Sequence, residues 1–107
     1  MSDAPKPLET LDWSGPGAPS ASSVAERLRA EGVEPMAWSN GPGDRYGRHS
    51  HGYTKLLMCA AGSITFLIGA DETPLDLGPG DGFVLPPGVD HAAVVGPEGC
   101  TCVEGHR

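Results

Sequence analysis

The fold is decided by the stretch GDRYGRHSHGYTKLLMCAAG, residues 43–62. It contains His49-Ser50-His51, in which one residue separates two histidines. Side chains two positions apart on a β-strand point to the same face of the sheet, with Cα atoms about 6.5 Å apart. Two imidazoles placed in this way can converge on one ion, with metal–nitrogen bonds of about 2.0–2.1 Å. The stretch therefore predicts a metal site built on a strand.

A third histidine, His91, follows the rigid turn Pro86-Pro87-Gly88. The chain has 4 histidines, and three of them lie between residues 43 and 95. The fourth, His106, lies next to the last residue, and we expect it to be solvated. The scarcity of histidine elsewhere favours a common role for His49, His51 and His91.

The composition predicts a single all-β domain that binds neither nucleic acid nor a membrane. The chain has 107 residues, 16 glycines and 11 prolines, which indicates many tight turns and short strands. Its net charge of −7 excludes an electrostatic footprint for nucleic acid or an anionic membrane surface. No apolar run approaches the roughly 20 residues that span a bilayer.

We expect a cytoplasmic protein with reduced thiols. Residues 1–5 lack the basic and apolar parts of a signal peptide. The odd number of cysteines, Cys59, Cys100 and Cys102, also fits a reducing compartment. The pair Cys100-Thr101-Cys102 stands alone, so ordinary strand residues are a better interpretation than a zinc site.

The chain divides into a flexible N-terminal tail over residues 1–21 and a β-barrel domain over residues 22–107. The tail is rich in proline, glycine and serine. In an alternative, Leu11 and Trp13 dock as an edge strand. Ser23 and Glu26 fit a capping box, which predicts one short helix ending near Gly32.

After Gly32 the pattern becomes that of short strands between turns, which is typical of a sandwich or barrel. Strands are expected at residues 33–38, 44–51, 55–61, 63–68, 75–77, 82–85, 91–95 and 100–104, with a turn at residues 96–99. The expected core is Leu56, Leu57, Met58, Ile64, Phe66, Ile68, Leu75, Leu77, Phe83, Val84, Leu85, Val94 and Val95.

Two spacings in the chain resemble the two motifs of the cupin superfamily. The first motif has a glycine, five residues, His-x-His, three or four residues, a glutamate, six residues and a glycine. Here the corresponding residues run from Gly43 through His49-Ser50-His51 and Lys55 to Gly62. The second motif places Pro-x-Gly, a histidine and an asparagine after a glycine. Here it runs from Gly80 through Pro86-Pro87-Gly88 and His91, with Val95 at the asparagine position.

The resemblance implies a double-sheet jelly-roll barrel. It also implies that His49, His51 and His91 bind one divalent transition metal. Three imidazoles would accept Zn, Fe, Ni or Mn. A small-molecule ligand in the barrel and a homodimer are further expectations from the family.

Lys55 stands where metal-binding cupins usually have a glutamate ligand. An ammonium has no acceptor and repels a dication, so two outcomes are open. Lys55 either pairs with a carboxylate such as Asp44 or Glu104, or stays near the metal for an anionic ligand. Tyr53 and Cys59 share strand parity with His49, His51 and Lys55, so they are expected to face the barrel too. We place Lys55 and Tyr53 as candidate catalytic residues, with Tyr53 as a proton donor.

Three functions are compatible with these residues. The first is a metal-dependent enzyme, with dioxygenase-like or Lewis-acid chemistry on a small anionic carbonyl or enol compound. The second is a non-catalytic module that binds a small ligand or a metal. The third is a structural domain that pairs with another protein, although no residue indicates such a partner.

Overall fold

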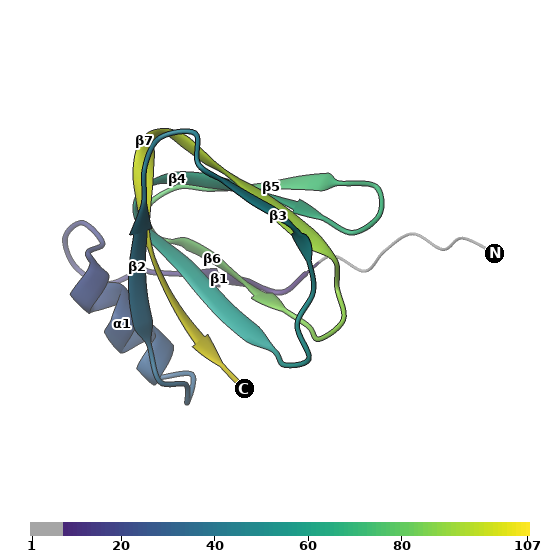
Figure 1. Ribbon diagram of the computed structural model, residues 1–107. Helices are drawn as coiled ribbons and strands as arrows, with labels where there is room; N and C mark the ends of the chain where they lie inside the picture. The colour runs from purple at the N-terminus through teal and green to yellow at the C-terminus, as the bar shows by residue number, and fades with distance from the viewer. Residues whose placement is uncertain (1–7) are drawn as a thin grey trace.

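The computed structural model describes residues 8–107, which form one short helix and an antiparallel β-structure (Figure 1). The all-β jelly-roll prediction is thereby confirmed. The strands pair in the order β1-β6-β4-β7-β2, while β3 pairs with β7 and β5 with β4. The elements are β1 (Thr10–Asp12), α1 (Ala21–Arg29), β2 (Met36–Asn40), β3 (Arg45–His49), β4 (Lys55–Ile68), β5 (Thr73–Leu77), β6 (Asp81–Leu85) and β7 (His91–His106).

Two long strands, β4 and β7, run through the whole barrel side by side. The sequence predicted one strand on each side of Gly62 and one strand on each side of a turn at residues 96–99. Both predictions were wrong, because β4 and β7 each continue through the expected break. The chain bends at Gly62 and at residues 96–99 without leaving the sheet. The β4–β7 register shifts between Cys59 and Ala61 and between Gly62 and Ile64. Bulges of this kind turn a strand around the corner of a barrel.

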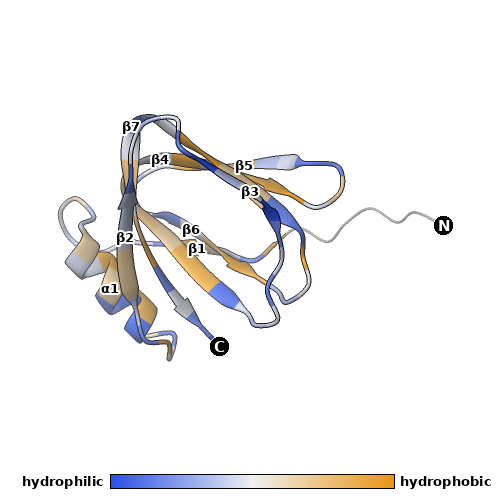
Figure 2. Cartoon of the chain, in the orientation of Figure 1, coloured by the Kyte–Doolittle hydropathy of each residue, from blue (hydrophilic) through white to orange (hydrophobic). Residues whose placement is uncertain are grey.

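The first part of β4 is apolar at every position from Leu56 to Ala60 because both of its faces are buried. Leu57 and Cys59 point into the barrel and join a cluster with Phe66 and Phe83. Leu56, Met58 and Ala60 point the other way and pack under α1 with Leu11, Val24, Leu28, Val33, Val84 and Val103. Figure 2 shows the matching hydrophobic colour along β4 and on one side of α1.

The predicted core is largely confirmed. Of its members, Ile68, Leu75 and Val94 are only partly buried. The prediction omitted the helix residues Val24 and Leu28, which are fully buried, and the cysteines of β4 and β7. Cys59, Cys100 and Cys102 are free thiols that fill the barrel interior as small apolar residues.

The N-terminal segment differs from the prediction in two ways. Helix α1 begins three residues early, because Ser20 is the N-cap and forms a capping box with Ser23. The expectation of a tail through residue 21 is also wrong for residues 10–12, which form β1 and pair with β6. Leu11 is buried there, as the edge-strand alternative expected. Residues 1–7 of the predicted tail lie outside the described residues.

Within residues 8–107, no helix is both long and apolar enough to cross a membrane.

Candidate metal centre

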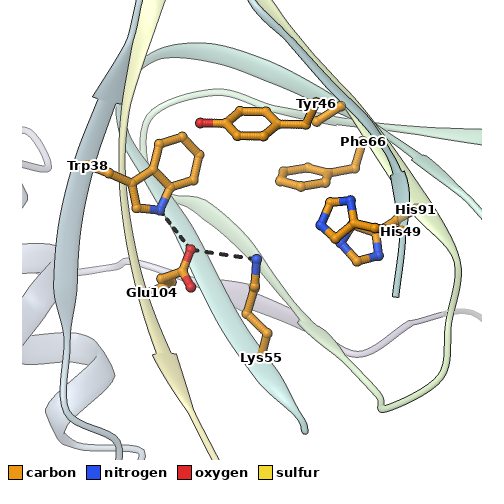
Figure 3. Close-up of a pocket in the computed structure, with 8 residues that line it drawn as sticks. Trp38, Tyr46, His49, Lys55, Phe66, His91 and Glu104 are labelled. Atoms are coloured by element: carbon orange, nitrogen blue, oxygen red, sulfur yellow. Dashed lines mark hydrogen bonds and ion pairs between the residues drawn. The ribbon is translucent and has the colours of Figure 1, made fainter. Parts of the chain in front are cut away.

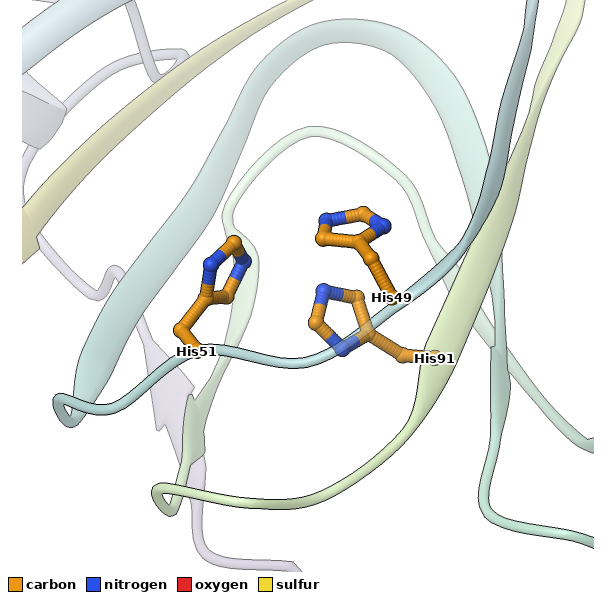
Figure 4. A group of neighbouring side chains, drawn as sticks. All are labelled: His49, His51 and His91. Carbon is orange, nitrogen blue, oxygen red and sulfur yellow. The ribbon is translucent and has the colours of Figure 1, made fainter.

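The three predicted histidines converge at the end of the barrel where β3 and β7 meet (Figure 4). His49 ends β3 and pairs directly with His91, the first residue of β7. His51 follows in the loop after β3. One ring nitrogen from each residue lies within 4.8 Å of the other two, and no other such group of three occurs in residues 8–107. The convergence of these side chains is therefore a property of the fold.

The outer nitrogens of the rings are held by partners that turn the inner nitrogens toward one another. The Nδ1 atoms of His49 and His91 lie 2.6 Å and 3.0 Å from the carbonyl oxygens of Gly47 and Val89. A carbonyl only accepts, so each Nδ1 carries the proton and each Nε2 keeps its lone pair. The Nδ1 of His51 lies 3.3 Å from the Tyr53 hydroxyl. Partners of this kind orient metal-binding histidines.

The two less exposed members of the cluster, His51 and His91, have lowered pKa values, which favours their neutral form. Burial lowers the pKa of His51, and the nearby charge of Lys55 lowers it further. Burial also lowers the pKa of His91, against an opposing contribution from its hydrogen bond to Val89. A neutral imidazole is the form that binds a metal. The Nε2 atoms of His51 and His91 are buried and have no hydrogen-bond partner within the described chain.

A cavity of about 210 Å³ opens beside two of these histidines. Figure 3 shows its aromatic wall, made by Trp38, Tyr46 and Phe66, and its charged wall, made by Lys55 and Glu104. The complete lining is Trp38, Tyr46, His49, Lys55, Phe66, His91, Ala93 and Glu104. Strands β2, β3, β4 and β7 all contribute, so the cavity is the interior of the barrel mouth.

Lys55 pairs with a carboxylate, as one of the two open outcomes expected, and it does so without leaving the cavity. Its Nζ lies 3.6 Å from Glu104 Oε1, and it also lines the cavity. Glu104 accepts hydrogen bonds from Trp38 Nε1 at 2.7 Å and from His106 Nε2 at 2.8 Å. Burial raises the pKa of Glu104, but the hydrogen bond from His106, the charge of Lys55 and the Trp38 hydrogen bond outweigh it, and the pKa falls below its usual value. The carboxylate is therefore ionised.

The other candidates lie outside the cavity lining. Tyr53 stacks on His51 and on His106, with ring centroids 4.9 Å and 4.1 Å away. Cys59 is in the core and donates its thiol hydrogen toward the Ala61 carbonyl. Asp90, the residue before His91, is an exposed acid near Arg48.

Sequence reasoning missed the aromatic residues of the cavity, Trp38 and Tyr46. Trp38 lies on β2, far from the histidines in sequence. Tyr46 lies on β3 three residues before His49, where strict alternation predicts the opposite face, and the register shift between these two residues brings both into the lining. The alternation of β2 is a weak signal that Trp38 faces inward, but which residues it meets depends on the pairing of β2 with β7. The carbonyls of Gly47 and Val89 carry no sequence signal.

Comparison with solved structures finds the same fold in several bacterial proteins. An RmlC-like cupin from Shewanella frigidimarina is 26% identical, with a TM-score of 0.57, and the match covers 69% of this chain and 64% of that one. KdgF from a Halomonas species is 20% identical, with a TM-score of 0.58 and coverage of 70% and 69%. YcfD, a ribosomal oxygenase from Escherichia coli solved with cobalt and succinic acid, is 21% identical, with a TM-score of 0.65 and coverage of 81% and 28%.

This chain thus spans under a third of the ribosomal oxygenase and about two thirds of the two smaller proteins. No curated protein matches the sequence. A family model for the AraC-like ligand-binding domain matches residues 38–103, which hold all three histidines, every cavity-lining residue except Glu104 and most of the barrel. The chain belongs to the AraC-like ligand-binding domain family and has the cupin fold.

Proposed function

We propose that His49, His51 and His91 bind one divalent transition metal, and that this centre binds a small anionic ligand in the adjacent cavity. The observation that carries the proposal is the pair of buried Nε2 atoms on His51 and His91 without a hydrogen-bond partner in residues 8–107. Leaving a buried polar atom unpaired costs about 1–3 kcal/mol. A metal ion would satisfy both atoms at once, along with the third imidazole.

The donor set fits such an ion. Three nitrogens that each lie about 2.0–2.1 Å from one ion are about 3.3–3.6 Å from one another, whereas here they lie within 4.8 Å. The most widely spaced pair would therefore close by about 1 Å or slightly more, and the exposed His49 has room to move. Three neutral imidazoles suit Zn, Fe, Ni or Mn, and geometry and availability select among them.

The lack of the usual glutamate ligand changes the charge and the number of open positions of the proposed metal centre. Three neutral ligands leave the full double charge on the ion, and open positions for a ligand are typical of reactive metal sites. When bound, the ion would supply Lewis-acid polarisation of an oxygen on the ligand. Lys55 would contribute a second positive charge beside the ligand. Tyr53 would orient His51 through its Nδ1, in place of the proton-donor role first considered.

Elemental analysis of protein purified without chelators tests the metal. We expect about one transition metal per chain, and less than a tenth of that in His91→Ala. His106→Ala is the matched control because it also removes an imidazole but lies outside the cluster. Less than about one metal per ten chains after loading with each candidate ion would refute the proposal.

Catalysis is the second candidate, favoured by the open shell of three histidines. The reaction class would be dioxygenase-like or Lewis-acid chemistry on a small anionic carbonyl or enol compound. Rapid oxygen consumption by iron-loaded protein with a 1,3-dicarbonyl, a thiol or a flavonol would support it. Tight ligand binding without turnover of any compound in this panel would assign the chain to non-catalytic binding.

A further inference from the structure

In the cavity beside the histidines, the apolar surface and the free polar group belong to different residues. Three of the six aromatic residues of the chain, Trp38, Tyr46 and Phe66, line it. Their polar atoms are already used by the protein, since Trp38 Nε1 donates to Glu104 at 2.7 Å and the Tyr46 hydroxyl donates to Asn40. What these residues present to the cavity is therefore ring surface.

The ammonium of Lys55 is the charged group with unused hydrogen-bonding capacity. Its side chain is only 11% exposed, and its contact with Glu104 Oε1 is 3.6 Å long, beyond the roughly 2.7–2.9 Å of a charge-assisted hydrogen bond. No hydrogen bond from Lys55 Nζ is found among residues 8–107. Glu104, in contrast, has one partner on each oxygen, Trp38 and His106. An ammonium has three donors and no acceptor, so the missing partner is an acceptor, most favourably an anion.

From this division we infer that the cavity binds a single-ring aromatic carboxylate. The carboxylate accepts hydrogen bonds from Lys55, and the ring packs against Trp38, Tyr46 and Phe66. Aromatic pairs contribute about 0.5–1.5 kcal/mol beyond their buried area. The volume of about 210 Å³ is below the roughly 300–1,000 Å³ of pockets for drug-sized ligands, which selects one ring over fused rings. The inference rests on the proposed function in one respect, because the side of the ligand nearest the histidines would lie beside the proposed metal.

Sugars also stack on aromatic side chains, but this cavity lacks what a sugar needs. A neutral sugar presents many hydroxyls, each requiring a hydrogen-bond partner when buried. Here the indole, phenol and carboxylate groups of the lining are already paired within the protein. The proposed function assigns the imidazole Nε2 atoms to the metal, so the unpaired group of the lining within residues 8–107 is the Lys55 ammonium, which favours a compound with one anionic end and an otherwise apolar body.

Calorimetric titration of zinc-loaded protein with four probes tests the inference. Benzoate has the inferred charge and shape, cyclohexanecarboxylate has the charge without the flat ring, benzamide has the ring without the charge, and glucose represents sugars. We expect benzoate to bind at least about tenfold more tightly than each of the others, a difference of about 1.4 kcal/mol. Equal binding of cyclohexanecarboxylate, or tighter binding of benzamide or glucose, would overturn it.

Two variants, Lys55→Met and Trp38→Phe, test where the ligand lies in the cavity. Lys55→Met keeps the length of the side chain and removes the ammonium, so benzoate affinity should fall at least about tenfold. Arg45→Met is the matched control, because it removes a positive charge from the position before Tyr46, whose side chain points to the opposite face of β3. Benzoate should also quench tryptophan fluorescence in the parent protein and not in Trp38→Phe. An equal loss of affinity in both methionine variants would contradict the assignment to Lys55.

Metal content, measured on the same samples, separates this inference from the proposed function. Protein that retains zinc but does not bind benzoate overturns the inference and leaves the metal site standing. Protein without metal that binds benzoate through Lys55 refutes the metal site and supports the ligand class. Protein that retains no zinc and binds no benzoate refutes both.

Discussion

Lys55 shows how one residue changes the chemistry expected of a site with the spacing of the first cupin motif. A carboxylate at this position would neutralise part of the charge of a bound ion, whereas the ammonium adds to it. The fold tolerates a nearly buried ammonium because Glu104, from the neighbouring strand β7, lies 3.6 Å away. Removing one partner of such a buried pair costs more than the pair itself contributes, because the other charge is left uncompensated.

Replacing Lys55 by glutamate should tighten metal binding by about tenfold or more, since it offers the ion an anionic ligand. The metal-free protein should become less stable, because two carboxylates would then lie together beside β7. Competition with a chelator measures the affinity, and thermal unfolding with and without metal measures the stability. Lys55→Met is the control that removes the ammonium without adding a ligand. An unchanged metal affinity would show that position 55 does not reach the ion.

Glu104 makes stability depend on pH in a defined direction. Its pKa is lowered in the folded chain from an ordinary value of 4.5, so its contribution is complete above pH 4.5 and is lost as the pH falls through the lower folded value. Glu104→Gln should reduce the free energy of unfolding by about 1–3 kcal/mol at pH 7. The difference from the parent protein should shrink steadily below about pH 4.5.

Urea unfolding at pH 7 and at pH 3.5 measures this effect. Glu98→Gln serves as the control, because Glu98 is exposed and loses the same charge without a buried network. A difference between the parent protein and Glu104→Gln that stays constant across the pH range would mean that the charge of Glu104 contributes nothing.

At the scale of elements, β4 and β7 build the barrel by turning a corner together. Gly62 has φ +71, and a Cβ added there would lie 2.0 Å from the carbonyl oxygen of Gly99. Gly99 itself has φ +78. The two strands therefore approach more closely at the corner than any side chain allows, and this approach carries β4 from the helix-covered side of the barrel to the β5 side.

Gly62→Ala should reduce the free energy of unfolding by about 3 kcal/mol or more, because it combines a left-handed backbone with a backbone clash. Gly43→Ala is a matched control, since Gly43 has φ +73 but nothing within 4 Å of an added Cβ. It should cost only about 1–2 kcal/mol. Equal losses for the two variants in urea unfolding would show that the corner is less tightly packed than the structure has it.

At the scale of the whole molecule, the homodimer expected from the cupin resemblance stays a prediction. Strand β2 pairs with β7 on one side only, and Met36 on β2 is 63% exposed. An unpaired edge with an exposed apolar residue is a template for pairing with a second copy. Light scattering after size-exclusion chromatography should give twice the mass of one chain.

Met36→Lys should shift this mass toward the monomer, because lysine on an edge strand opposes pairing. Ala70→Lys, in the exposed loop between β4 and β5, controls for the change in net charge because it also adds one positive charge. A monomeric parent protein at micromolar concentration would rule out the dimer.

Much of the fold and the histidine cluster was predictable from local pattern. The resemblance of the two spacings to the cupin motifs implied the barrel, and strand parity placed Lys55 and Cys59 on its inner face. These features depend on residues close in sequence, and the two-residue period of a strand is a local property. The same parity argument failed for Tyr53, which lies in the loop after β3 and not on a strand.

The sequence by itself determined that three imidazoles and an ammonium would be carried by one barrel, because the two motif spacings and the alternation of strand residues place them there. Only the tertiary structure decided that Lys55 meets Glu104, that Trp38 and Tyr46 close the cavity, and that backbone carbonyls orient His49 and His91. The contacts of Glu104 and Trp38 join residues that are far apart in sequence, whereas the two carbonyls lie only two residues before the histidines but have no side-chain pattern that predicts their direction. The long-range contacts depend on strand register, which is set by the packing of the whole barrel.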